Sequence, residues 1–190
     1  MPESMAQRSF ETAAIAHPLD TFYARTGLEL PTIKGLAADE VPEPYHSLLV
    51  HRRDMTSTLE SFHGEGVHLH VVGRDQRNGD YFREVVLRLD RTEKPVEFGA
   101  IKINLELFPK AAQGQILKEH LPLGRILKDC SIQYQSQPQA FLRIASDAMM
   151  NDLLKLRGAQ LLYGRRNTLF DPQGRRLAEI VEILPPIQQS

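Results

Sequence analysis

The chain has 190 residues, of which 42% are hydrophobic and 25% charged, and its formal net charge is -1. This length favours one globular domain with a substantial core, and the composition is typical of a soluble protein. The near-neutral charge gives no reason to expect nucleic acid or an anionic membrane as a partner.

Cysteine usage and hydropathy indicate a soluble cytoplasmic protein. The single cysteine, Cys130, cannot form an internal disulfide, and we interpret it as a small packed residue and not as a nucleophile. No stretch approaches the roughly 20 apolar residues of a membrane-spanning helix. Residues 1–16 lack the basic and apolar regions of a signal peptide.

The first 44 residues are predicted to form an N-terminal arm with a short helical segment. Prolines are frequent in residues 17–44, so any regular structure there must be short. The pattern changes from Glu43 onward, where apolar side chains begin to recur regularly. We therefore divide the chain into an arm, residues 1–44, and a single globular domain, residues 45–190.

The domain begins with helices and continues as a three-stranded meander. Apolar residues recur at helical spacing from Leu48 to Phe62, and Asp54 is placed to cap the second of two helical pieces. An Asn78-Gly79 pair then predicts a tight hairpin turn. Hydrophobicity alternates as it does in strands in residues 67–72, 81–89 and 96–107.

The rest of the domain mixes helices with further strands. Helices are predicted at residues 112–121 and 147–156, and strands at residues 131–144, 160–171 and 177–184. No strand–helix–strand repeat is present. The order therefore predicts an α+β fold with an antiparallel sheet and helices on one side of it.

Two charged residues lie in otherwise apolar strands. Arg83 shares a predicted strand face with Tyr81 and Val85, where a guanidinium needs an anion. Glu182 lies between Val181 and Ile183 and needs a partner or a raised pKa. Three interpretations remain open: a buried Arg83–Glu182 salt bridge, exposed residues of edge strands, or a site in which both face one acidic ligand.

A histidine cluster raises a metal-binding alternative. His68 and His70 project from the same face of a predicted strand, close to His63, and could bind zinc or iron. The spacing resembles a cupin motif, but the glutamate and the second half of that motif are missing. We interpret the histidines as residues of a solvated face and predict neither a metal nor a cofactor.

A set of short segments is informative as an ordered group. These segments are Asp54-Met55-Thr56, Phe82-Arg83-Glu84-Val85-Val86-Leu87, Pro122-Leu123-Gly124-Arg125, Tyr163-Gly164-Arg165-Arg166 and Val181-Glu182-Ile183-Leu184-Pro185. Their order and spacing, over residues 45–186, resemble those of the chorismate lyase (chorismate–pyruvate lyase) family. The resemblance implies a six-stranded antiparallel sheet whose helices enclose an internal ligand cavity. It also implies a cofactor-free enzyme that converts chorismate to 4-hydroxybenzoate and pyruvate.

The resemblance assigns roles to particular residues. Arg83 would bind a substrate carboxylate, and Glu182 would face the ring hydroxyl and assist proton movement, so these two would be the catalytic residues. Met55, through its backbone, and Leu123 would line the same cavity as substrate-binding residues. A planar guanidinium suits a carboxylate partner because it can donate two parallel hydrogen bonds.

Departures from the family leave a second function open. The family tends to carry an arginine after the glycine of the third strand, where this chain has Gly99-Ala100. The same fold serves as the effector-binding half of GntR-type repressors, which bind ligands without chemistry. The alternative is therefore a non-catalytic module that binds an aromatic carboxylate. Residues 1–45 are too proline-rich and too short for the DNA-reading domain of a repressor, but not for a stand-alone binder.

Overall fold

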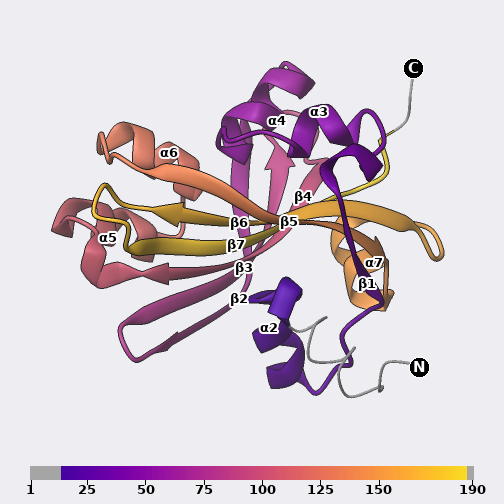
Figure 1. Cartoon of the computed structure of the whole chain (residues 1–190), viewed down its shortest axis with the longest axis horizontal. Helices are drawn as coiled ribbons and strands as arrows, with labels where there is room; N and C mark the ends of the chain where they lie inside the picture. Colours follow the sequence, from indigo (N-terminus) through magenta and orange to yellow (C-terminus); the bar gives the residue numbers. More distant parts are fainter. Residues whose placement is uncertain (1–13, 188–190) are drawn as a thin grey trace.

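The computed structural model describes residues 14–187, which fold around a seven-stranded antiparallel sheet (Figure 1). The strand order is β1-β5-β6-β7-β4-β3-β2. The strands are β1 (Ile33–Leu36), β2 (Val67–Arg77), β3 (Asp80–Leu89), β4 (Pro95–Asn104), β5 (Gln135–Ala145), β6 (Leu161–Phe170) and β7 (Arg176–Leu184). The predicted α+β class is confirmed.

The meander of β2, β3 and β4 forms where the alternating pattern predicted it. Asn78 and Gly79 connect β2 to β3 with φ angles of 53° and 83°. Positive φ at both central residues is what a type I′ hairpin turn requires, and asparagine and glycine tolerate it best. This turn fixes the register of β2 against β3, in which Arg83 lies opposite Arg74.

The sheet has one strand more than the six that were predicted. Residues 33–36, within the segment assigned to an N-terminal arm, form β1 and pair with β5. Ile33 is buried opposite Ile144, so this short strand contributes to the core. Four residues between proline-rich stretches are too short to show a strand pattern, which is why the sequence did not predict it.

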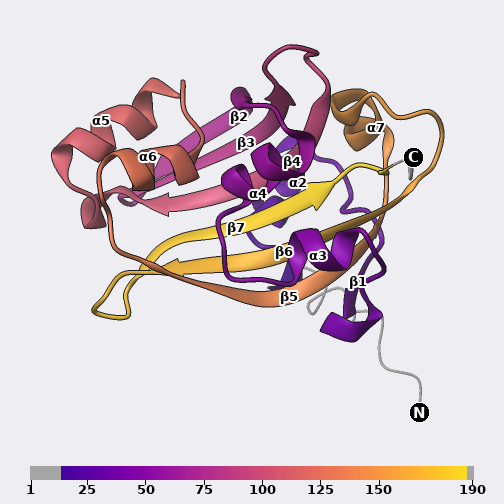
Figure 2. The ribbon, with the colours of Figure 1, turned by 90° about the horizontal axis from the view of Figure 1, so that it is seen from above.

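Helices cover both faces of the sheet, which corrects the prediction that they lie on one side. The helices are α2 (Leu19–Thr26), α3 (Tyr45–Leu49), α4 (Met55–His63), α5 (Lys110–Lys118), α6 (Leu123–Asp129) and α7 (Ala148–Leu154), with 3₁₀ turns η1 (Ala38–Glu40) and η2 (Leu105–Leu107). Helices α3 to α6 lie over one face and are on the viewer's side in Figure 2, whereas α2 and α7 lie over the other.

The second layer of helices forms because both faces of the central strands are apolar. Phe82 and Val86 of β3 point away from the α3–α6 side and pack in one core cluster with Phe98 of β4. Leu19 of α2 and Met150 of α7 belong to the same cluster and are fully buried. An uncovered sheet face of this kind would leave a large apolar surface in water.

Two of the helices begin at aspartates that cap them, and the cap at Asp54 is the one that the sequence pattern indicated. Asp54 accepts a hydrogen bond from the Ser57 backbone N–H at 2.8 Å and starts α4. Asp147 accepts one from the Met150 backbone N–H at 2.8 Å and starts α7. Among the residues that the structure describes, no helix is both long and apolar enough to cross a lipid bilayer.

Candidate functional site

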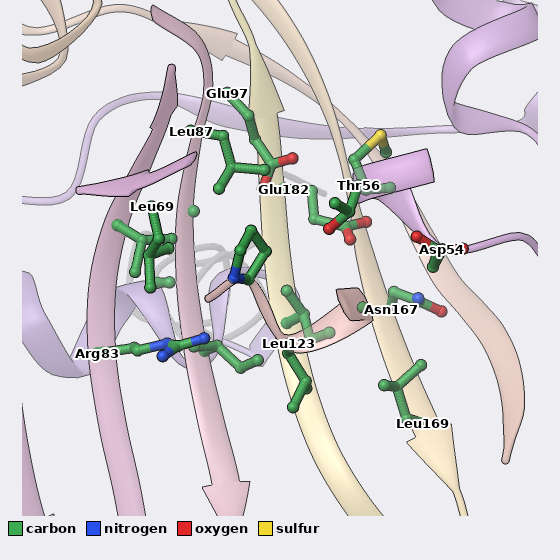
Figure 3. Close-up of a pocket in the computed structure, with 18 of the residues that line it drawn as sticks. Asp54, Thr56, Leu69, Arg83, Leu87, Glu97, Leu123, Asn167, Leu169 and Glu182 are labelled. Carbon is green, nitrogen blue, oxygen red and sulfur yellow. The ribbon is translucent and has the colours of Figure 1, made fainter. Parts of the chain in front are cut away.

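A cavity of about 70 Å³ lies between the sheet and the first turns of α4 and α6 (Figure 3). A buried water occupies about 10–15 Å³ by the same measure, so the space suits several waters or a small organic molecule. Met55, Arg83, Leu123 and Glu182, the residues that the sequence proposed for a site, all line it. The structure therefore brings them together, and their roles toward a ligand remain predictions.

The floor of the cavity consists of neighbouring rows of cross-strand residues. Strands β3, β4, β7 and β6 lie side by side, and directly opposed residues project from the same face. One row contains Val85, Gly99, Glu182 and Arg165, and the next contains Arg83, Ile101, Ile180 and Asn167. The strand pairing thus places charged residues that are distant in the sequence within one small area.

Arg83 enters the cavity from β3 as a buried cation. Its exposed fraction is 1%, and its Nε and Nη1 atoms have no hydrogen-bond partner among the described residues. Its Nη2 atom donates only a long 3.5 Å bond to the Leu121 carbonyl oxygen. Burial lowers the pKa of Arg83 to about 10, and the nearby Tyr81 and Glu119 partly oppose this. The guanidinium therefore stays charged at neutral pH, although no carboxylate among the described residues forms a salt bridge with it.

Glu182 forms its ion pair with Arg165 and not with Arg83. The Arg165 Nε atom donates to Glu182 Oε2, and Arg165 is fully buried. The suggested Arg83–Glu182 salt bridge is thus absent from the described residues. The direct opposition of positions 165 and 182 on β6 and β7 explains the choice of partner.

Arg165 also ties the segment between α3 and α4 to the sheet. Its Nη1 atom donates to the carbonyl oxygens of Leu49 at 3.3 Å and His51 at 3.0 Å. Its Nη2 atom donates to the carbonyl oxygen of Arg53 at 3.1 Å. Since α4 begins directly after this segment, the Arg165–Glu182 pair positions the helix that closes the cavity.

Glu97 of β4 is a cavity residue that the sequence analysis missed. It lines the cavity, is 5% exposed, and its Oε2 atom has no hydrogen-bond partner among residues 14–187. Burial raises its pKa well above the ordinary value, the Glu182 carboxylate raises it further, and Arg165 opposes both. These effects favour the uncharged acid. A charge between Val96 and Phe98 is the same kind of signal that singled out Arg83.

Gly99 makes room for the Glu97 carboxyl group. A Cβ atom at position 99 would lie 3.1 Å from Glu97 Oε1 and 3.3 Å from the Val181 carbonyl oxygen. The side chain of Ala100, by contrast, belongs to the core cluster on the α2 and α7 side. An arginine at position 100 would project away from the cavity in this register, so its absence does not remove a cation from the site.

Helices α4 and α6 form the roof of the cavity as a closely packed pair. A Cβ atom at Gly124 would lie 2.8 Å from Asp54 Oδ1 and 3.0 Å from Thr56 Oγ1, so the two helix starts are nearly in contact. Arg125 of α6 donates to Glu60 of α4 at 3.0 Å. Because this ion pair is partly exposed, most of the contact energy comes from packing.

The histidine cluster lies apart from the cavity. His68 of β2 contacts Asp90 at 3.0 Å and Glu93 at 3.3 Å in a solvated region. Among the described residues, no group of three or more histidine, cysteine, aspartate or glutamate side chains is arranged to hold a metal ion.

The cavity has a cationic side, an acidic side and apolar walls. Figure 3 shows the Arg83 guanidinium and the carboxyl groups of Glu97 and Glu182 pointing into the same space from different strands, with Leu123 of the roof close by. Apolar walls with a few convergent polar groups are typical of sites for small organic ligands. The arrangement fits a ligand with an anionic group at one end and a polar group at the other.

No family model and no curated protein matches the sequence. Solved structures do match. PhnF from Mycobacterium smegmatis has a TM-score of 0.54 at 12% identity, over 87% of this chain and 92% of that one. The effector domain of the same protein has a TM-score of 0.53 at 10% identity, over 73% and 96%. A GntR-family transcriptional regulator from Enterococcus faecalis V583 reaches only 0.46 at 9% identity, over 64% and 99%.

At these identities the likeness concerns the fold alone. The seven-stranded antiparallel sheet with its helices is a chorismate lyase-like α+β fold, which this chain shares with PhnF and its effector domain. The fold hosts both ligand binding and catalysis, so the residues of the cavity must decide between them.

Proposed function

We propose that the protein is a ligand-binding module whose cavity takes a small aromatic monocarboxylate, with Arg83 holding the carboxylate. The observation that carries this proposal is a buried guanidinium that lines the cavity and has two nitrogen atoms without a hydrogen-bond partner among the described residues. Burying a charge without a partner is costly, and proteins rarely retain such a group without a use for it. A carboxylate would satisfy both the charge and the free donors.

The charges inside the cavity favour a ligand with one negative charge. Arg165 and Glu182 neutralise each other, and burial favours the uncharged form of Glu97. Asp54 of the lining caps α4, and Arg83 has no salt-bridge partner among the described residues. A monoanion would balance it, whereas a dianion would place a second negative charge beside the Glu182 carboxylate without a cation to receive it.

The comparisons agree with binding. The PhnF effector domain covers 73% of this chain at a TM-score of 0.53. A likeness at this level supports the fold, and the proposal for a ligand rests on the cavity.

A chorismate lyase activity is the second candidate, and the meeting of Met55, Arg83, Leu123 and Glu182 in one cavity favours it. Chorismate would lose its C4 proton and its C3 enolpyruvyl group, the latter as pyruvate, to leave 4-hydroxybenzoate. Arg83 would hold the ring carboxylate and Glu182 would face the 4-hydroxyl. Aromatisation drives the reaction, so the protein would mainly orient the substrate. Chorismate is a dianion, however, and Arg165 is already paired with Glu182.

One experiment separates the two functions. The protein is incubated with chorismate at high enzyme concentration, pyruvate is measured with lactate dehydrogenase and NADH, and binding of 4-hydroxybenzoate is measured in parallel. We expect binding without pyruvate. Pyruvate release that depends on Arg83 would establish the lyase instead. If the protein neither binds 4-hydroxybenzoate nor releases pyruvate, both functions are contradicted. Arg143→Ala is the matched control, because this strand arginine of β5 is exposed and outside the cavity.

A further inference from the structure

We infer that Glu97 selects the ligand: its carboxyl group meets the end of the ligand remote from Arg83 and accepts an uncharged hydroxyl there, but not a second carboxylate. This inference rests on the proposed function, since it assumes that Arg83 holds the first carboxylate. It names the ligand class as hydroxy monocarboxylates. The ligand hydroxyl would then contact Glu97, a residue outside the segments that resemble chorismate lyase, on the acidic side of the cavity.

The first support is that Glu182 is already occupied. Its Oε2 atom accepts the Arg165 Nε–H, and Arg165 is held in turn by backbone carbonyl oxygens of residues 49–53. Turning Glu182 toward a ligand would weaken a buried ion pair that anchors the start of α4. Glu97 has no comparable partner, and its Oε2 atom is buried and unbonded within the described residues.

The second support is the position of Glu97 relative to Arg83. Arg83 pairs with Ile101 and Leu87 pairs with Glu97, so the two charged positions lie four residues apart along neighbouring strands. At about 3.3 Å per residue this separates their rows by roughly 13 Å. The side chains point toward the same cavity from these positions, which leaves space between the end groups for the body of a small ligand (Figure 3).

The third support is the structure of the floor between them. Val85 and Gly99 are opposed in the intervening row, and Gly99 has no side chain to fill the space. The Glu97 Oε1 atom lies over this glycine, 3.1 Å from the place of a Cβ atom. A larger residue at position 99 would displace the carboxyl group, so the glycine and the acid form one feature of the site.

The charges that face Glu97 explain why it would reject a second carboxylate. The neighbouring charged groups are Glu182 on β7 and Arg165 on β6, and these two already form an ion pair. An uncharged acid can donate its proton to a hydroxyl oxygen and accept the hydroxyl hydrogen. A carboxylate placed there would have a negative charge beside Glu182 and no free cation, which is unfavourable in a buried site.

Calorimetric titration of the full chain with 4-hydroxybenzoate, benzoate and terephthalate tests the inference. We expect wild type to prefer 4-hydroxybenzoate over benzoate by about tenfold, the worth of one buried hydrogen bond, and to reject terephthalate. Glu97→Gln keeps size and hydrogen bonding and should retain the preference for the hydroxyl. Glu97→Leu removes the hydrogen bond to the hydroxyl, so the ratio of the affinities for 4-hydroxybenzoate and benzoate should fall to about one. Binding of benzoate should persist.

The outcomes distinguish this inference from the function on which it rests. Arg83-dependent binding with no preference for the hydroxyl, or with terephthalate bound as tightly, would overturn the role of Glu97 and leave the binding module intact. Absence of binding by all three compounds would overturn both. If Glu97→Leu fails to fold, the wild-type ligand series and Glu97→Gln decide the matter, because a glutamine variant that loses the hydroxyl preference contradicts an uncharged hydrogen-bonding role.

Discussion

Arg165 and Glu182 face each other across β6 and β7 and form a buried ion pair, while Arg83 in the next row has no such partner within residues 14–187. Arg83 lines the cavity, whereas Arg165 lies beside it on β6 and holds the Glu182 carboxylate. Arg165 forms a structural ion pair, whereas Arg83 carries a buried positive charge that an anionic ligand would neutralise.

Breaking the buried ion pair should cost stability. Arg165→Met leaves the Glu182 carboxylate buried without its cation and releases residues 49–53 from the sheet. We expect a loss of about 3–5 kcal/mol in the free energy of unfolding, measured with urea. The double variant Arg165→Met/Glu182→Leu removes both charges and should be less destabilised than Arg165→Met alone. The single variant Glu182→Leu completes the cycle, and a double variant whose loss equals the sum of the two single losses would show that the pair is not coupled.

Removing the unpaired cation should have the opposite effect. Arg83→Leu eliminates a buried charge without breaking an ion pair, so the free energy of unfolding should rise by roughly 1–3 kcal/mol. Thermal and urea unfolding of the unliganded protein measure it, and the exposed-arginine variant Arg143→Ala should change little. A marked loss of stability in Arg83→Leu would mean that Arg83 holds the fold together instead of awaiting a ligand.

The contact between the two roof helices can be tested with two glycines. Gly124→Ala places a methyl group against the Asp54 carboxylate, which is fixed because it caps α4. We expect a loss of about 1–3 kcal/mol in stability and faster ligand dissociation, because α6 must move away from α4. Gly114→Ala in α5 is the matched control, since no atom of the described part of the chain lies within 4 Å of a Cβ atom there. It should raise stability slightly through helix propensity; equal effects at both positions would refute the close contact.

The second face of the sheet predicts a pH dependence of stability. Burial raises the pKa of Glu84 on β3 from 4.5 to about 7, and Arg25 of α2 opposes this only partly. The folded protein then binds a proton that the unfolded chain has released, so stability falls as pH rises from about 4.5 to 7. In Glu84→Gln the decrease in the free energy of unfolding over this pH range should be smaller than in wild type, by up to roughly 3 kcal/mol. Urea unfolding at several pH values measures it, and parallel curves for variant and wild type would contradict the shift.

The central sheet and part of the site were predictable because their signals are local. Alternation and the Asn78-Gly79 turn located β2 and β3, and a charge among apolar neighbours singled out Arg83 and Glu182. The partner of Glu182 was not predictable in this way, because it depends on which strand lies beside β7. Glu97 carries the same local signal but follows the charged turn at Glu93 and Lys94, where another charge is unremarkable. The second layer of helices likewise follows from tertiary burial of Phe82 and Val86.

The most direct test of the account is a calorimetric titration of 4-hydroxybenzoate into wild type and Arg83→Leu at neutral pH. We expect saturable binding to one site in wild type and at least a hundredfold loss of affinity, about 2.7 kcal/mol, in the folded variant. Wild-type affinity in Arg83→Leu, or no binding to wild type at all, would contradict the claim that Arg83 is the carboxylate anchor of a ligand cavity.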